Sequence, residues 1–535
     1  MMIAPPIGPV AMPDDHVAQI VTYYRRRPSL DALSNALALL NGEAPREIAD
    51  LLAGLDAPWS DHAVASVYAA LMGKGRRKAL GAYFTPPGLV GYLLARAQQF
   101  GVDLAEGRVR DPAAGGAAFI VPIARAMVKR WRSEALDNPA IIERLAGRLT
   151  GREIDPGLAA LANALLQRCL VEEYGFDPAL AATLNVILEA DTLTVEDDRG
   201  ADHEIGNPPF LRLAAKQEPA NADRFEDINS GRLNLYSIFV RRGLAALPAG
   251  GVLAYIIPAS FIGGPEFSRF RLRIRQLAEV LAVDMIEGRS NVFMDVVQDT
   301  CVLVLRKRAA ELNEVGEATA ASNSVGGDGA FHAEGTVTLP PGDRPWVLPG
   351  AAQDLPSTLA DWGYSARIGY LVANRQADRL HKRVAPGRVP LIWAKAIGQD
   401  GTFDFARGAQ FREMNWVDAP ADAPYIARSA CVAVQRTSAR GQKRRITAAE
   451  LPAEFVEQHG GVIAENHVIL LLPTRDDAAP PSALAAALNL PAVGEQLDRM
   501  CGSASIPARL LEQVPLPAAP ITRALRRSTA NCSGK

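Results

Sequence analysis

The sequence predicts an α/β protein with a mixed, mostly parallel, doubly wound sheet, followed by an α+β domain. Apolar strand-like runs alternate with helical runs between about residues 109 and 306, which is the pattern of a parallel sheet. The chain of 535 residues is also too long for one hydrophobic core, so we expect two or three domains.

Composition excludes several classes of protein. The chain is 48% hydrophobic with a net charge of −2, so any nucleic-acid surface must be local. No apolar run is long enough to cross a bilayer, and Met1–Pro13 lacks a basic stretch followed by an apolar core. We therefore expect a cytoplasmic protein without a membrane partner. The five cysteines are scattered without a CxxC pair, which disfavours a metal site and a disulfide framework.

The first domain is expected over residues 79–308, after a helical N-terminal segment over residues 1–78 whose apolar residues recur at helical spacing. Near its start, Thr85 precedes two prolines and the helical run Leu89–Gln99. The Thr85 hydroxyl could hold a ligand carboxylate or cap this helix, and capping is the more common role.

Acidic residues follow three of the predicted strands. Asp111 opens a turn of small residues that would let the backbone approach a ligand, although a tight strand-to-helix turn explains it equally well. This turn lacks the GxGxxG fingerprint, so a nicotinamide cofactor is disfavoured. Glu153 closes the strand Arg148–Ile154, at the position where doubly wound folds grip a ribose diol. Asp191 follows the strand Asn185–Leu188.

A stiff polar motif, Asn207-Pro208-Pro209-Phe210, follows the fourth strand. Both prolines have a fixed φ and no N–H, so the backbone is held extended. The Asn207 amide can bind the edge of a planar ligand, and Phe210 offers a face for stacking. An exocyclic amino group on a nucleobase would suit this site. For the tetrapeptide alone, a Pro-Pro loop with a buried Phe is the commoner explanation.

The alternation then continues to the end of the domain, and a change of composition follows it. The expected elements are the helix Leu235–Leu247, the strand Gly251–Pro258, the helix Phe267–Leu281 and the strands Val283–Glu287 and Thr300–Arg306. Residues 309–345, rich in Ala, Gly, Ser, Asn and Glu, are expected to be a linker or an exposed insertion.

Residues 346–535 are expected to form the α+β domain, with a local basic surface. Tyr364–Arg388 holds six basic residues against one acidic, and Arg436–Arg445 holds five against none. Solvated charge is the usual explanation, but two such runs favour a surface that follows phosphates. The candidate DNA contacts are Gln435, Arg436, Arg440, Lys443, Arg444 and Arg445, of which Gln435 and Arg436 could read bases.

With these motifs in order, the chain resembles a gamma-class adenine-N6 DNA methyltransferase of the restriction-modification type. The resemblance covers roughly residues 70–515. It implies a Rossmann-like class I methyltransferase domain over residues 79–308, a DNA target-recognition domain over residues 346–535, and S-adenosylmethionine as cofactor. The implied partners are double-stranded DNA with a flipped base and a cognate restriction endonuclease, and no metal is required.

The resemblance also implies roles for single residues in cofactor binding. Thr85 resembles a residue that helps to hold the methionine carboxylate. Glu153 would grip the ribose hydroxyls, Ile154 would pack on the cofactor adenine, and Asp191 would bind its amino group. The residues that match the family's cofactor turn, DPAxGxGxF, are Asp111, Pro112, Ala113, Gly115 and Phe119; Ala117 replaces its second glycine.

Catalysis is implied for Asn207, Pro208, Pro209 and Phe210. Hydrogen bonds from the target amino group to the Asn207 side-chain carbonyl and the Pro208 main-chain carbonyl would shift the nitrogen toward sp³ and free its lone pair. Phe210 and Phe293 would stack on the flipped base.

Two other functions stay open at this point. A methyltransferase of the same fold could act on RNA or on a protein glutamine, because Asn-Pro-Pro chemistry suits a side-chain amide. The basic C-terminal third argues against it. A DNA-specificity subunit with an inactive transferase domain is the other alternative, against which the intact motif argues. A fused nuclease is disfavoured, since neither end shows a recognisable acidic site.

Overall fold

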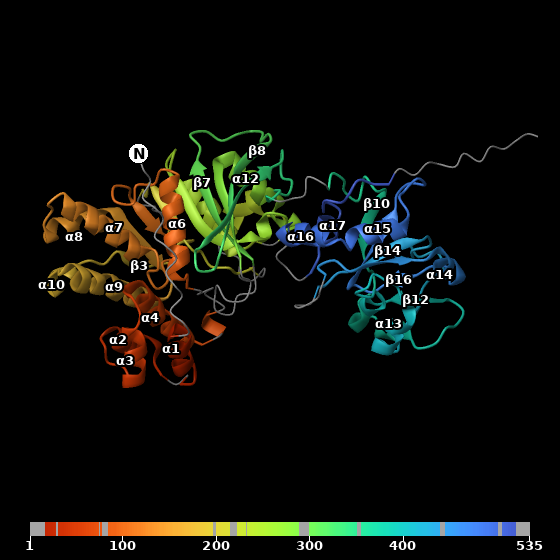
Figure 1. The fold of residues 1–535 in the computed structure, drawn as a ribbon, viewed down its shortest axis with the longest axis horizontal. Helices are drawn as coiled ribbons and strands as arrows, with labels where there is room; N and C mark the ends of the chain where they lie inside the picture. The colour runs from red at the N-terminus through yellow and green to blue at the C-terminus, as the bar shows by residue number, and fades with distance from the viewer. Residues whose placement is uncertain are drawn as a thin grey trace, which may run out of the picture. The chain divides into compact units, whose positions relative to one another are not determined.

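The computed structural model describes residues 16–27, 30–73, 75–77, 84–195, 200–213, 222–231, 233–287, 299–349, 355–438, 444–500 and 505–520. It divides into two compact units (Figure 1). Unit 1 comprises residues 1–262 and 266–349, and unit 2 comprises residues 263–265 and 350–535.

Unit 1 is built on a nine-stranded sheet with the order β3-β2-β1-β4-β5-β7-β6-β8-β9 (Figure 1). The strands are β1 (Val109–Asp111), β2 (Leu149–Glu153), β3 (Ile187–Glu189), β4 (His203–Gly206), β5 (Val252–Pro258), β6 (Ala278–Ile286), β7 (Thr300–Lys307), β8 (Ala318–Val325) and β9 (Phe331–Leu339). Strands β7 and β9 run antiparallel to their neighbours, and the other strands run parallel to one another. The predicted mixed, mostly parallel sheet is confirmed.

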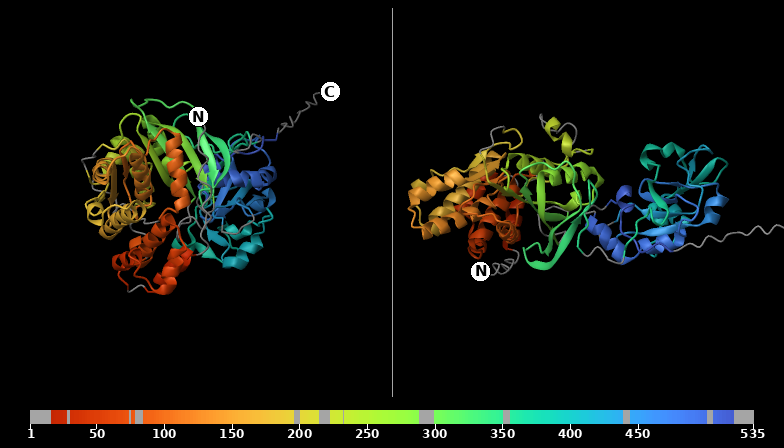
Figure 2. Two further views of the ribbon diagram at one scale, coloured as in Figure 1. Left: turned by 60° about the vertical axis from the view of Figure 1, so that its left-hand side comes forward. Right: turned by 90° about the horizontal axis from the view of Figure 1, so that it is seen from above.

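Helices cover both faces of this sheet (Figure 2). Strand β5 is buried along its whole length, and its residues alternate between two cores, with Ala254 in one and Tyr255 in the other. The first core also contains residues of α6 (Pro87–Gln99), α7 (Ile120–Ser133), α8 (Asn138–Arg148), α9 (Pro156–Arg168) and α10 (Pro178–Ala181). The second contains residues of α11 (Leu235–Ala246) and α12 (Ser268–Leu277).

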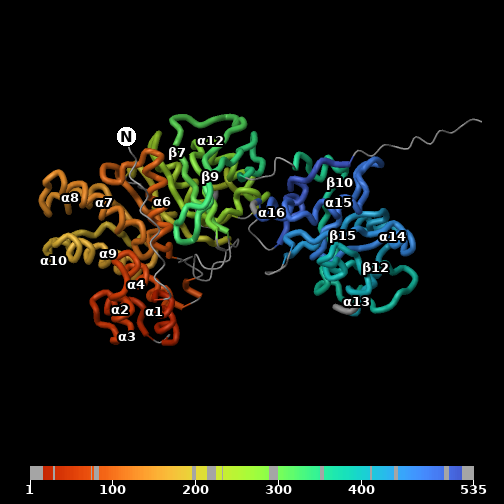
Figure 3. Tube along the Cα trace, in the orientation of Figure 1, coloured from red at the N-terminus to blue at the C-terminus, as the bar shows by residue number. Residues whose placement is uncertain are grey.

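The N-terminal segment is helical, as the spacing of its apolar residues predicts. Its described helices are α1 (His16–Arg25), α2 (Ala32–Leu40), α3 (Arg46–Ala53) and α4 (Ala57–Leu71), drawn in red in Figure 3. Val64 and Val67 of α4 belong to the same core as Leu161 of α9. The segment is therefore packed into unit 1 and is not a separate module.

The prediction of a linker over residues 309–345 is wrong. Strand β8 pairs with β6 in parallel and with β9 in antiparallel orientation, so this stretch extends the sheet. Ala320, Val337 and Leu339 pack in the second core. Small and polar residues between these apolar positions give the stretch the composition of a linker. In addition, helix α12 ends at Leu277, and β6 begins earlier than the predicted strand.

Unit 2 contains two four-stranded sheets and short helices, an α+β arrangement. One sheet has the order β10-β17-β14-β15 and the other β11-β13-β12-β16. The strands are β10 (Tyr364–Ile368), β11 (Leu380–His381), β12 (Arg388–Ile392), β13 (Trp416–Asp418), β14 (Cys431–Gln435), β15 (Ala448–Leu451), β16 (Ile463–Ala464) and β17 (Val468–Pro473). The helices are α13 (Phe405–Arg412), α14 (Ala453–Gln458), α15 (Pro481–Leu488), α16 (Pro491–Met500) and α17 (Ala508–Leu511). In the described parts of both units, every helix is too short or too polar to cross a bilayer.

A buried ion pair crosses the middle of the unit 1 sheet. Arg110 on β1 donates from Nε to Oε1 of Glu204 on β4 at 2.8 Å, and both side chains are 1% exposed. The Tyr255 hydroxyl on β5 also donates to Glu204. Gly243 of α11 lies directly against this carboxylate, because a Cβ there would be 2.3 Å from Glu204 Oε2.

We expect Gly243→Ala to lower the free energy of unfolding by about 1–3 kcal/mol, since the added methyl group overlaps a buried, hydrogen-bonded carboxylate. Urea unfolding monitored by circular dichroism measures the change. Gly147→Ala on α8 is the matched control, because a methyl group at that position would meet nothing within 4 Å. It should raise stability by about 0.5–1 kcal/mol through helix propensity. Equal effects of the two substitutions would contradict the packing described here.

Candidate functional site

The carboxyl ends of β1, β2, β3 and β4 meet at one edge of the unit 1 sheet, where ligands bind in open α/β sheets. A cavity of about 350 Å³ lies there. All the predicted cofactor residues line it: Thr85, Asp111, Pro112, Ala113, Gly115, Phe119, Glu153, Ile154 and Asp191. Asn207 and Pro209 also line it, whereas Pro208 and Phe210 do not. Phe293 lies outside the described residues.

A second, more open depression of about 660 Å³ contains none of the predicted residues. Two of the residues that line it, Arg108 and Asp202, pair with each other at 2.8 Å. Within the described part of the chain, no group of three or more His, Cys, Asp or Glu side chains is arranged to hold a metal ion. The cavity at the strand ends is therefore the candidate site.

Asp111, the last residue of β1, carries an unsatisfied oxygen. Its side chain is buried, and Oδ1 accepts a hydrogen bond from the Ala113 N–H at 3.1 Å. The buried Oδ2 has no hydrogen-bond partner among the described residues. Burial, with the negative charges of Glu153 and Glu204, raises the pKa of Asp111 to about 8. Buried carboxyl groups normally have their partners, so this oxygen is suited to a cationic ligand group.

The turn after Asp111 has a backbone conformation that favours small residues. Gly115 has a φ of 52° and Ala117 a φ of 61°, both in the left-handed region. A Cβ on Gly116 would lie 2.4 Å from Cβ of Ala65 on α4. Ala117 thus keeps the left-handed conformation that a glycine would adopt freely, at a cost of roughly 1–2 kcal/mol.

Glu153, the last residue of β2, is held at both carboxylate oxygens. Oε2 accepts from the Gly115 N–H and Oε1 from the Asp155 N–H, each at 2.9 Å. The side chain is buried, and this burial raises the pKa of the carboxyl above its usual range. Each oxygen keeps a second lone pair, so the oriented carboxylate can also accept hydrogen bonds from a diol.

The apolar and polar walls of the cavity come from neighbouring residues. Ile154, directly after Glu153, lines the cavity and is 50% exposed, which is unusual for an isoleucine in a packed domain. Asp191, two residues after β3, accepts at Oδ1 from the Leu193 N–H at 2.9 Å. The site thus offers an apolar surface between two carboxylates.

Asn207 follows β4, and its amide is oriented by a residue far away in the sequence. Nδ2 donates to the Thr85 hydroxyl oxygen at 3.0 Å. Sequence reasoning missed this bond, because the helix cap was the commoner role for Thr85. The N-cap residue of α6 is instead Pro86, which makes no side-chain capping bond. Gly206 allows the approach of β4 to β1, since a Cβ there would lie 2.6 Å from Asp111 Oδ1.

The other two members of the motif, Pro208 and Phe210, pack against the protein and do not line the cavity. Pro208 is buried, and Phe210 is partly buried against the first core. The tetrapeptide therefore presents Asn207 and Pro209 to the cavity while the rest of it packs.

Three of the predicted DNA contacts of unit 2 have partners within the protein. Gln435 Nε2 donates to the carbonyls of Ala394 and Ile397 at 3.0 and 2.8 Å. Arg436 Nη1 donates to the Asn466 carbonyl at 3.0 Å. Arg445 pairs with Asp498 at 2.6 Å, and its side chain is 9% exposed. Arg444 is half-buried, and Arg440 and Lys443 lie outside the described residues.

Four of the six basic residues in the run Tyr364–Arg388 have partners within unit 2, and two of the four are ion-paired. Arg367 donates to the Pro424 carbonyl at 2.9 Å, and Arg379 to the Asp418 carbonyl at 2.8 Å. Lys382 pairs with Glu413, and Arg388 with Asp418 at 3.0 Å. A local excess of basic residues in the sequence therefore does not translate into an equal excess of unpaired charge.

The sheet order and the helices on both faces define a Rossmann-like α/β fold of the class I methyltransferase type. Known proteins with similar sequences are methyltransferases of restriction-modification systems. Residues 171–293 match the family model described as Eco57I restriction-modification methylase. The type II methyltransferase M.PaeR7I of Pseudomonas aeruginosa is 29% identical over 221 residues, which is 38% of each chain. M.PstI of Providencia stuartii is 24% identical over 260 residues, 46% of this chain and 50% of that protein.

The chain spans between about a quarter and half of the length of the curated relatives it matches. Among solved structures, the M protein of the type I restriction enzyme EcoKI has a TM-score of 0.35 and 17% identity, over 58% of this chain and 72% of that one. The DrdV–DNA complex has a TM-score of 0.48 and 13% identity, over 86% and 57%. By sequence, parts of the chain are similar to restriction-modification methyltransferases.

Ala117→Gly tests the strained position in the cofactor turn. Relief of the left-handed strain stabilises the folded state by roughly 1–2 kcal/mol, and the extra conformational entropy of glycine in the unfolded chain offsets about 0.5–1 kcal/mol of this. The free energy of unfolding should therefore rise by about 0–1.5 kcal/mol. Cofactor binding should be retained, because the backbone already has the conformation that glycine prefers. Thermal unfolding and calorimetric titration measure the two quantities. A large loss of affinity would show that the Ala117 methyl group itself supports the site.

Proposed function

We propose that the protein transfers a methyl group from S-adenosylmethionine to the N6 amino group of adenine in a specific DNA sequence, as the modification enzyme of a restriction-modification system. The observation that carries the proposal is the cavity in which Asp111, Glu153, Asp191 and Asn207 converge at the ends of β1 to β4. The sequence relationship to type II methyltransferases supports DNA as the substrate.

The residues present fit this cofactor. The unsatisfied buried oxygen of Asp111 would receive the ammonium group, and the carboxylate of Glu153 would accept from the ribose diol. The exposed face of Ile154 would lie on the adenine ring, whose amino group Asp191 would bind. When bound, S-adenosylmethionine supplies an electrophilic methyl group on a sulfonium.

The chain's own residues would prepare the target nitrogen. The Asn207 side-chain carbonyl and the Pro208 main-chain carbonyl accept hydrogen bonds from the adenine amino group, which draws the nitrogen lone pair out of conjugation with the ring. With Asn207 Nδ2 donating to the Thr85 hydroxyl oxygen, the side-chain carbonyl is the end of the amide that accepts from the adenine amino group. Because the adenine must leave the duplex, Phe210 and Phe293 would stack on it and offset the lost base stacking.

We propose that unit 2 recognises the DNA and that its basic residues contact the phosphates. Since Gln435, Arg436 and Arg445 bond to groups of unit 2 itself, their contact with DNA would require these bonds to rearrange or to be shared. Arg444 makes no such ion pair with the described residues of unit 2 and is the better candidate for a phosphate contact.

Asn207→Ala should abolish the reaction while leaving cofactor binding nearly intact. Loss of one hydrogen-bonding group acting on the transition state lowers kcat by about 10²–10³-fold. Transfer of labelled methyl groups to duplex DNA, with mass spectrometry of the digested nucleosides, measures rate and product. Asn41→Ala, at an exposed position directly after α2, is the control. Transfer by Asn207→Ala at the wild-type rate would refute the assignment, and a labelled RNA or protein would favour the alternative substrates.

Cofactor affinity should rise with pH from about 6 to 8. Asp111, with a pKa of about 8, is protonated below that pH in the free protein, and a bound ammonium favours its ionised form. Binding therefore releases a proton, and affinity increases by up to about tenfold per pH unit until about pH 8. Calorimetry in buffers of different ionisation enthalpy measures the proton release. Asp111→Asn should remove it, and a pH-independent affinity in the wild type would contradict the role of Asp111.

A further inference from the structure

The two anchors of the Glu153 carboxylate lie in different segments of the chain. Its Oε2 depends on the Gly115 N–H in the turn after β1, and its Oε1 on the Asp155 N–H before α9. Both oxygens of Glu153 accept hydrogen bonds from main-chain N–H groups. A shift of the turn after β1 or of the segment before α9 would therefore move the Glu153 carboxylate.

Helix α4 contacts both of these segments. The Tyr68 hydroxyl donates to Asp155 Oδ1 at 2.5 Å, 87 residues away in the sequence. A Cβ on Gly157 would lie 2.2 Å from the Tyr68 hydroxyl oxygen. One turn earlier, Ala65 lies against Gly116 so closely that an added Cβ would be 2.4 Å away. The same helix face therefore backs the two segments that hold Glu153.

Asp155 depends on the donor that α4 supplies. Its side chain is fully buried, caps α9 by accepting from the Leu158 N–H at 3.0 Å, and pairs with Arg76 at 2.6 Å. Burial and the bond to Asp155 raise the pKa of Tyr68, so the phenol stays a donor throughout the neutral range. A buried carboxylate that loses one donor must shift toward another, and its own N–H moves with it.

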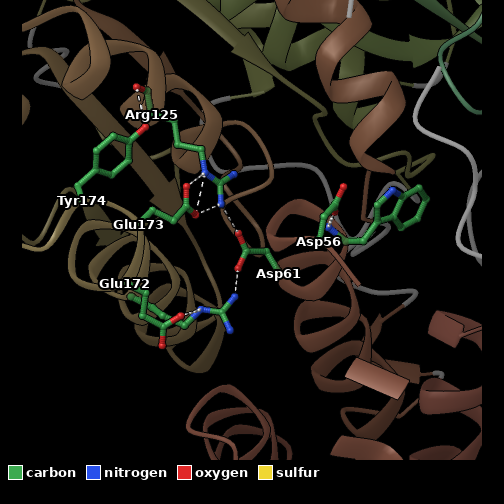
Figure 4. A network of polar contacts seen from close by, with 8 residues as sticks. Asp56, Asp61, Arg125, Glu172, Glu173 and Tyr174 are labelled. Atoms are coloured by element: carbon green, nitrogen blue, oxygen red, sulfur yellow. Dashed lines mark hydrogen bonds and ion pairs between the residues drawn. The ribbon is translucent and has the colours of Figure 1, made fainter. Parts of the chain in front are cut away.

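Helix α4 is itself fixed on the catalytic domain by ion pairs (Figure 4). Asp61, one residue before His62, lies between Arg125 of α7 and Arg168 of α9 and pairs with both. Arg125 pairs in addition with Glu173 at 2.6 Å. These ion pairs hold α4 against α7 and α9.

We propose that Tyr68, acting through Asp155, is a positioning residue that sets the Glu153 carboxylate for the ribose diol of the cofactor. The N-terminal helices are then a working part of the cofactor site. This inference rests on the proposed function, because it requires Glu153 to bind the diol.

The test is calorimetric titration of the full chain and of Tyr68→Phe with S-adenosylhomocysteine and with its 2′,3′-dideoxy analogue. Tyr68→Phe should weaken binding of S-adenosylhomocysteine by about fivefold, within the range for one ordinary hydrogen bond. It should leave binding of the dideoxy analogue unchanged, because that ligand has no diol for Glu153 to hold. Tyr24→Phe, at a buried tyrosine of α1 in the same core, is the matched control and should change neither affinity.

Equal weakening for both ligands would show that Tyr68 only supports the fold, and unchanged affinities would show that it does not act on Glu153; either result overturns the inference. Should Tyr68→Phe fail to fold, Gly157→Ala takes its place, since its Cβ displaces the Tyr68 hydroxyl and should give the same diol-specific loss. Failure of the wild type to bind S-adenosylhomocysteine, or to prefer it over the dideoxy analogue, would instead overturn the proposed function.

Discussion

The burial of two carboxylates, Glu153 and Asp155, is the constraint on which the site depends. A buried carboxylate is costly unless hydrogen-bond donors surround it, so each one dictates where several donors must lie. Glu153 requires the Gly115 and Asp155 amides, and Asp155 requires the first turn of α9 and the Tyr68 hydroxyl. The turn after β1, the start of α9 and helix α4 are fixed together for this reason.

A second buried group fixes the other half of the site. Arg110, Glu204 and Tyr255 join β1, β4 and β5 across the sheet, just behind the strand ends that carry Asp111 and Asn207. Buried ion pairs contribute little net stability against a well-packed apolar core, but breaking one leaves an uncompensated charge. Their value here is geometric, because they hold the strand ends at a set separation. Gly206 then lets Asn207 follow β4 in close contact with β1.

Arginines that are clustered in the sequence of unit 2 are bonded in its structure to groups of the same unit. Arg367 and Arg379 bond to carbonyls of the segment around Pro424 and Asp418, so they fix loops of the unit. A guanidinium has five donors and can bind a backbone carbonyl and a phosphate at once, which keeps a DNA surface on unit 2 compatible with these bonds. The fold of unit 2 thus uses the same residues that the sequence marks as candidates for phosphate contacts.

The sequence by itself determined the parallel sheet of unit 1, the acidic ends of its strands and the identity of the motif residues. These features are local: periodicity, short apolar runs and adjacent residue types are visible in one stretch of chain. Tertiary structure alone decided that residues 318–339 add strands to the sheet, that Thr85 orients Asn207, and that α4 packs behind the turn after β1. Each of these depends on contacts between residues far apart in the chain. The sequence shows no periodic pattern for such contacts. Examples are the strand pairing at the sheet edge, the Thr85 hydroxyl 122 residues from Asn207, and the buried Tyr68 donor to Asp155.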